Sequence, residues 1–113
     1  MITIYHNNRC RKSREGLEIL EISGKEYRIR GYLKEPLDEQ EIRLLLGKLN
    51  MTPIQLVRKN EKKWKENYKD KELSDSELIS ILAKNPELIE RPVVETEITA
   101  VIGRPSSLIE KIL

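Results

Sequence analysis

The residues best suited to chemistry gather in one stretch, residues 5–14, which reads Tyr-His-Asn-Asn-Arg-Cys-Arg-Lys-Ser-Arg. This stretch holds Cys10 and His6, the only cysteine and the only histidine of the chain. Five side chains close to the sulfur in sequence are cationic or can become so, namely His6, Arg9, Arg11, Lys12 and Arg14. Positive charges lower the pKa of a thiol and favour the nucleophilic thiolate. The stretch therefore predicts an activated cysteine, whereas the alternative for a lone cysteine is a small buried hydrophobic residue.

The same stretch lies where the sequence pattern changes from strand to helix. Residues 1–5, Met-Ile-Thr-Ile-Tyr, form an uncharged run of β-branched and aromatic residues that is typical of a buried strand. From Arg11 the apolar residues follow a helical period, and Ser23-Gly24 indicates where that helix ends. Unpaired N–H groups and the helix dipole stabilise a thiolate at the start of a helix. The predicted position of Cys10 thus favours ionisation, as its cationic neighbours do.

The remaining elements must position this stretch. The pattern predicts a strand over 25–32, helices that begin at residues 38, 52, 74, 85 and 105, and two hairpin strands over 93–96 and 98–102. The order is β-α-β, a helical insert, and β-β-α, with a right-handed parallel crossover between the first two strands. It predicts an α/β, thioredoxin-like fold with a mixed four-stranded sheet and helices from both ends of the chain on its faces. We interpret residues 1–113 as a single domain with a helical subdomain inserted at 38–90.

Composition and charge argue against several classes of function. The 21 basic and 19 acidic side chains nearly cancel, so the formal charge of +2 gives no argument for an extended nucleic acid interface. No apolar run has the length of a membrane-spanning helix, and no segment has the pattern of a signal peptide. Because one cysteine cannot form an internal disulfide, we expect a protein of the reducing cytoplasm.

The cysteine count also limits the chemistry. One cysteine and one histidine leave a zinc site short of ligands, so no metal is expected. Ser13 occupies the position at which a CxxC motif would have its second cysteine. Any redox cycle that starts at Cys10 must therefore use a thiol from another molecule.

Three arginines lie at predicted element boundaries: Arg58 at a helix end, Arg91 before Pro92, and Arg104 after a glycine. The planar guanidinium group binds oxyanions through paired hydrogen bonds, which a lysine cannot do. If the fold brings these arginines to Cys10, they form an oxyanion site beside the thiol. Position alone leaves the alternative that each arginine is a solvated surface side chain.

With these residues in view, the sequence resembles the arsenate reductase (ArsC) family of the glutaredoxin-coupled kind, which shares its fold with the Spx transcription regulators. The resemblance covers nearly the whole chain. Its markers are residues 5–14, Tyr-Leu-Lys-Glu-Pro at 32–36, Leu-Val-Arg-Lys-Asn-Glu at 56–61, Leu-Ile-Glu-Arg-Pro-Val-Val at 88–94, and Ile-Gly-Arg-Pro at 102–105.

The resemblance implies roles for individual residues. Cys10 matches the family nucleophile, and His6 matches the histidine thought to tune it. Ser13 and Arg14 match the end of the active-site loop, and Pro92 matches a proline that is cis in thioredoxin-like folds. The oxyanion-binding arginines of the family match Arg58, Arg91 and Arg104. In the family a small residue commonly follows the cysteine, so Arg11 adds a cation that we expect beside the sulfur.

The implied reaction reduces arsenate to arsenite through a covalent cysteinyl-arsenate adduct. Glutathione is then a co-substrate, with no bound cofactor, and glutaredoxin clears the resulting mixed disulfide. Two alternatives remain open on the sequence. One is a thiol oxidoreductase that acts on other small or glutathionylated substrates, with the arginines binding glutathione carboxylates. The other is a non-catalytic, transcription-related binding protein like Spx.

Overall fold

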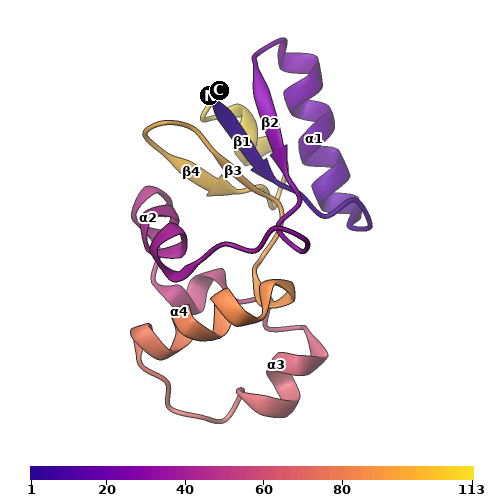
Figure 1. Cartoon of the computed structure of the whole chain (residues 1–113). Helices are drawn as coiled ribbons and strands as arrows, with labels where there is room; N and C mark the ends of the chain where they lie inside the picture. The colour runs from indigo at the N-terminus through magenta and orange to yellow at the C-terminus, as the bar shows by residue number, and fades with distance from the viewer. The chain divides into compact units, whose positions relative to one another are not determined.

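The computed structural model describes residues 1–113 and divides into two compact units. One unit combines Met1–Glu35 with Arg91–Leu113, and the other is Pro36–Glu90. The first, which we call the sheet unit, contains all four strands, whereas the second, the helical unit, contains none (Figure 1). No helix in either unit is long and apolar enough to cross a membrane.

The sheet unit is built on a mixed sheet in the order β2-β1-β3-β4. Its strands are β1 (Ile2–Tyr5), β2 (Tyr27–Arg30), β3 (Val93–Glu95) and β4 (Ala100–Ile102). β1 pairs parallel with β2, and the β3–β4 hairpin adds antiparallel strands on the other side of β1. The predicted mixed four-stranded sheet is therefore confirmed.

Two helices of the sheet unit pack on the same face of the sheet, namely α1 (Arg11–Ser23) and α5 (Ser107–Glu110). Their core is formed by four fully buried side chains, one each from β1, α1, β3 and α5: Ile4, Leu20, Val94 and Ile109. α1 ends where predicted, because Gly24 adopts the left-handed conformation (φ 72°) that glycine tolerates best. Ile4 thus anchors in the core the strand that leads to Cys10.

Several element boundaries differ from the prediction. β2 covers four residues rather than 25–32, and β4 starts at Ala100 rather than at residue 98. Ile29 of β2, which is an edge strand of the sheet, is 52% exposed. The last helix is a single turn, Ser107–Glu110, and does not reach the apolar residues at the C-terminus.

The helical unit consists of α2 (Glu39–Leu49), η1 (Pro53–Leu56), α3 (Lys62–Asn67), α4 (Asp75–Lys84) and η2 (Pro86–Leu88), where η denotes 3₁₀ turns. Local rules explain its two longest helices, which pack against each other. Asp38 with Glu41 and Ser74 with Glu77 form complete capping boxes, in which each side chain receives the other residue's backbone N–H. Both capped starts were predicted from the sequence.

The sheet unit brings three chain segments to one end of the strands. β1 ends at Tyr5 and leads into the loop 6–10, Arg91-Pro92 immediately precedes β3, and Gly103-Arg104 immediately follows β4. The Arg91–Pro92 bond is cis, as the resemblance implied, and so is Arg104–Pro105. This is the predicted thioredoxin-like arrangement, and it gathers the residues considered next.

Candidate active site

Cys10 is the N-cap residue of α1, so its sulfur lies at the N-terminus of a helix of 13 residues. The preceding loop is tightly folded: the Cys10 N–H donates to the backbone oxygen of Asn7 at 3.0 Å, and the Arg9 N–H donates to Asn7 Oδ1 at 3.0 Å. Asn7 therefore organises the turn through both its backbone and its side chain. Sequence reasoning missed this role, although asparagine at a loop start is a known signal for such a turn.

Two arginines distant in sequence meet beside the sulfur. Arg104 Nη2 lies 3.8 Å from Cys10 Sγ, and Arg104 Nε donates to the backbone oxygen of Arg91 at 2.7 Å. The Gly103 N–H donates to the backbone oxygen of Pro92 at 2.8 Å, which ties the two arginine-bearing segments together. The sheet therefore places residues 94 positions apart in direct contact.

The environment of Cys10 lowers the pKa of its thiol. Partial burial by itself raises that pKa, and it is the largest individual influence. The backbone N–H of Ser13, the charge of Arg91, the N–H of Lys12 and the charge of Arg104 act in the opposite direction and together outweigh it. The helix terminus and the two arginines thus both stabilise the thiolate.

The side chains of the basic residues that adjoin Cys10 in sequence have partners other than the sulfur. Arg11 and Lys12 each pair with Glu15, at 3.5 Å in both cases, and the Arg11 side chain is 85% exposed. Arg14 Nη1 donates to the backbone oxygen of Asn8 at 3.0 Å. None of these side-chain charges is among the causes that lower the thiol pKa, to which Lys12 contributes only its backbone. Arg11 is thus an exposed side chain that pairs with a residue one turn on, and its expected effect on the sulfur stays a prediction.

Ser13 connects the thiol to the histidine. Its side chain is completely buried, and its Oγ lies 2.7 Å from His6 Nδ1 and accepts the Asn7 N–H at 3.0 Å. Its backbone N–H meanwhile stabilises the Cys10 thiolate. His6 is thus linked to Cys10 through Ser13, which makes it a partner of the residue that contacts the sulfur.

Burial is the main reason that the pKa of His6 is lowered from its usual value near 6.5, and the positive charge of Arg14 lowers it further. Hydrogen bonding at the Ser13 backbone opposes this shift without reversing it. The imidazole is consequently neutral at neutral pH. A neutral imidazole that bonds Ser13 fits this environment, and an imidazolium ion does not.

Two glycines allow the arginine segments to approach α1 closely. A β-carbon on Gly103 would lie 2.7 Å from Ile109 Cδ1 and 3.1 Å from Pro92 Cγ. A β-carbon on Gly16 would lie 3.0 Å and 3.1 Å from the same two atoms. Pro92 is therefore held between a helix and a loop that only glycine lets come so close. These positions also went unnoticed in the sequence, where nothing distinguishes them from other glycines.

Arg58, the third predicted oxyanion-binding arginine, belongs to the helical unit. The preceding residue, Val57, forms a β-bridge with Ile89. The Arg58 N–H donates to the backbone oxygen of Leu88 at 2.7 Å. Its guanidinium Nη1 lies 3.3 Å from Glu61 Oε2. Its role at the thiol stays a prediction.

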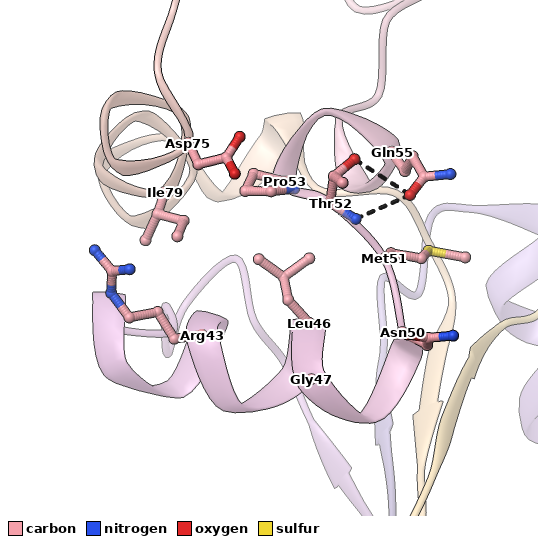
Figure 2. Close-up of a pocket in the computed structure, with 10 residues that line it drawn as sticks. All are labelled: Arg43, Leu46, Gly47, Asn50, Met51, Thr52, Pro53, Gln55, Asp75 and Ile79. Carbon is pink, nitrogen blue, oxygen red and sulfur yellow. Dashed lines mark hydrogen bonds between the residues drawn. The ribbon is translucent and has the colours of Figure 1, made fainter.

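A cavity of about 530 Å³ in the helical unit has neither cysteine nor histidine in its lining (Figure 2). Arg43 and Leu46 of α2 and Asp75 and Ile79 of α4 contribute to its lining. Thr52 donates to Gln55 Oε1 from its backbone at 2.9 Å and from its hydroxyl at 3.2 Å, as the dashed lines show. No group of three or more histidine, cysteine, aspartate or glutamate side chains is arranged to hold a metal ion in either unit.

Comparison with known proteins places this geometry in a family. The family model described as the ArsC family matches residues 5–112. The uncharacterized protein YfgD of Escherichia coli K12 is 41% identical, with 99% of this chain and 96% of YfgD covered. The arsenate reductase of the same strain is 35% identical, with 99% of this chain and 80% of the relative covered. The structure of an arsenate reductase from Vibrio cholerae superimposes with a TM-score of 0.93 at 37% identity, over 99% and 97% of the two chains.

These matches cover the active-site loop, both arginine segments and the helical unit. The chain belongs to the ArsC family.

Proposed function

We propose that this protein is an arsenate reductase in which Cys10 is the nucleophile and Arg91 and Arg104 bind the oxyanion. The observation that carries the proposal is the placement of a thiol of lowered pKa at a helix N-terminus with a guanidinium nitrogen 3.8 Å from its sulfur. The relatives named arsenate reductase support the choice of substrate. Arg58 is proposed as a third ligand of the oxyanion.

The geometry suits an attack on an oxidised, anionic centre. The thiolate forms a bond to arsenic(V), and one arsenate oxygen leaves as water after protonation. Fixed guanidinium groups stabilise the negative charge that develops on the remaining oxygens. Ser13 fixes the first turn of α1 through its buried hydroxyl, and His6 and Arg14 hold Ser13 and the loop in place.

Reduction needs two electrons, which two thiols supply. Glutathione attacks the Cys10 sulfur, the sulfur–arsenic bond breaks, and its electron pair leaves with arsenic, which becomes arsenic(III) and is released as arsenite. Cys10 is then a mixed disulfide with glutathione. A glutaredoxin thiolate attacks the glutathione sulfur and returns Cys10 as a thiolate. The absence of a second cysteine in the chain supports this use of external thiols.

The test is arsenite production by the purified protein with arsenate, glutathione and glutaredoxin. We expect turnover by the wild type and none by Cys10→Ser, since the alcohol does not ionise at neutral pH. Omitting glutaredoxin should leave at most a single turnover and a stable Cys10–glutathione disulfide, which mass spectrometry detects.

Two results would contradict the proposal. A wild-type protein that produces no arsenite, although Cys10 is reduced and reacts with alkylating reagents, is not an arsenate reductase. Full turnover without glutathione would keep arsenate as the substrate but would contradict the proposed order of attack by glutathione and then glutaredoxin. If instead the protein reduces glutathionylated peptides and leaves arsenate unchanged, the thiol oxidoreductase alternative is supported.

A further inference from the structure

A groove of about 440 Å³ runs along the loop that leads to Cys10. Four consecutive loop residues form one wall, and the end of β2 with the turn after it forms the other. The lining residues are His6, Asn7, Asn8, Arg9, Ile29, Gly31, Leu33 and Lys34, all of which belong to the sheet unit. The groove therefore adjoins the nucleophile, although Cys10 itself is not part of its lining.

Two aliphatic side chains in this groove are largely open to solvent. Ile29 is 52% exposed and Leu33 is 42% exposed. Ile29 lies on β2, an edge strand of the sheet. Exposed apolar side chains that gather beside a reactive group indicate an interaction site, whereas single ones scattered over a surface need no explanation.

The charged residues of the groove all have one sign. Arg9 and Lys34 line it and are exposed, and no aspartate or glutamate is among the lining residues. Arg14 binds the backbone oxygen of Asn8 and so fixes the shape of this wall. A ligand complementary to the groove therefore has an apolar group flanked by negative charges.

The chemistry proposed for Cys10 requires a visiting thiol, because the chain has no other cysteine. A thiol bound in the groove must extend beyond the lining to reach Cys10. A protein can cover the groove with one part of its surface and reach the sulfur with another. This difference favours a protein over a small molecule as the occupant.

We propose that the groove docks the protein thiol that reduces the Cys10 mixed disulfide, through an apolar side chain flanked by carboxylates on the partner. The inference rests on the proposed function insofar as Cys10 must be reduced by an external thiol. In the step, the partner thiolate attacks the glutathione sulfur. A new disulfide forms between partner and glutathione, the old one breaks, and its electron pair returns to Cys10 as the thiolate.

The experiment starts from Cys10 glutathionylated with oxidised glutathione, and it measures the second-order rate of reduction by glutaredoxin. The test variants are Ile29→Ser with Leu33→Ser, and Arg9→Glu with Lys34→Glu. The matched controls are Ile22→Ser, an isoleucine that is 77% exposed on α1, and Lys111→Glu, an exposed lysine after α5. Reduction by dithiothreitol serves as the reaction that needs no docking.

We expect both groove variants to slow reduction by glutaredoxin by about tenfold or more, with the charge variant also losing the dependence of the rate on salt. The controls should stay within about twofold of the wild type, and the dithiothreitol rate should be the same in all proteins. Equal glutaredoxin rates in groove variants and controls would overturn the proposal. Equal decreases in the rates of reduction by glutaredoxin and by dithiothreitol would also overturn it, because the substitutions would then alter the reactivity of the Cys10 disulfide and not docking.

A wild-type mixed disulfide that glutaredoxin reduces no faster than free glutathione would overturn it too. Because the assay contains no arsenate, its outcome is separate from that of the proposed function. A protein that fails to reduce arsenate but shows slower reduction in the groove variants retains the docking site and loses only the arsenate assignment.

Discussion

Two regions of the sheet unit supply cations near Cys10, and they affect the pKa of its thiol in different ways. Residues 9–14 surround Cys10 in sequence with four basic side chains, whereas residues 91–104 supply only two arginines. The pKa of Cys10 is nevertheless lowered by the charges of the second region, Arg91 and Arg104, and by backbone N–H groups of the first. A local cluster of charge thus says little about which charges reach a neighbouring atom.

The geometry of the first turn of α1 explains this difference between the two regions. Side chains of its first turn point away from the axis and pair with residues one turn on, as Arg11 and Lys12 do with Glu15. The N–H groups of the same turn point toward the N-terminus, where the sulfur lies. The first region therefore acts on the thiol through its backbone, and the second acts through its side chains.

The largest expected effect comes from a comparison of Arg104→Ala with Arg11→Ala. We expect Arg104→Ala to reduce arsenate turnover by about 10²–10³-fold, as loss of one preorganised donor does. The pH midpoint of Cys10 alkylation should rise in this variant, whereas Arg11→Ala should leave both quantities unchanged. A wild-type midpoint at or above about 8.5, the ordinary value for a thiol, would contradict an activated thiolate.

The second test asks what holds the arginine segments in place. Gly103→Ala introduces a β-carbon 2.7 Å from Ile109 Cδ1, so we expect the free energy of unfolding to fall by about 1–3 kcal/mol. Gly47→Ala in α2 is the control, because nothing lies within 4 Å of its β-carbon. It should gain about 0.5–1 kcal/mol from helix propensity. Urea denaturation of both variants measures the difference, and equal changes would remove the packing argument.

The third test concerns the link between the thiol and His6. Ser13→Ala removes a completely buried hydroxyl and leaves His6 Nδ1 and the Asn7 N–H without this partner. We expect a loss of about 1–3 kcal/mol in the free energy of unfolding. The exposed Ser107→Ala, at the start of α5, should change it by less than about 0.5 kcal/mol. Thermal or urea denaturation would decide, and a neutral Ser13→Ala would show that the buried bonds are not stabilising.

The smallest expected effect is a pH dependence of stability caused by His6. Because its folded-state pKa is lowered, the unfolded chain binds more protons just below pH 6.5. Its contribution is present above pH 6.5 and is lost as the pH falls through the folded-state pKa. The slope cannot exceed about 1.4 kcal/mol per pH unit. Since this is the only histidine, urea denaturation of His6→Gln between pH 7.5 and 5.5 should show a flatter profile than the wild type.

Much of the fold could be predicted because local rules determine it. Four features could be predicted because each depends on residues only a few positions apart. They are the capping boxes at Asp38 and Ser74, the end of α1 at Gly24, and the uncharged first strand. The ends of β2, β4 and α5 could not be predicted, because edge strands and chain ends depend on what packs beside them.

The sequence by itself determined that a lone cysteine begins a helix after a buried strand, and that any disulfide cycle needs an external thiol. Only the tertiary structure decided which cations act on that cysteine. Cβ-free positions at Gly16 and Gly103 let Pro92 and Ile109 pack closely, and the β1–β3 and β3–β4 pairings carry Arg91 and Arg104 to the same end of the sheet. Such proximity comes from strand register and core packing, which join residues far apart in the chain.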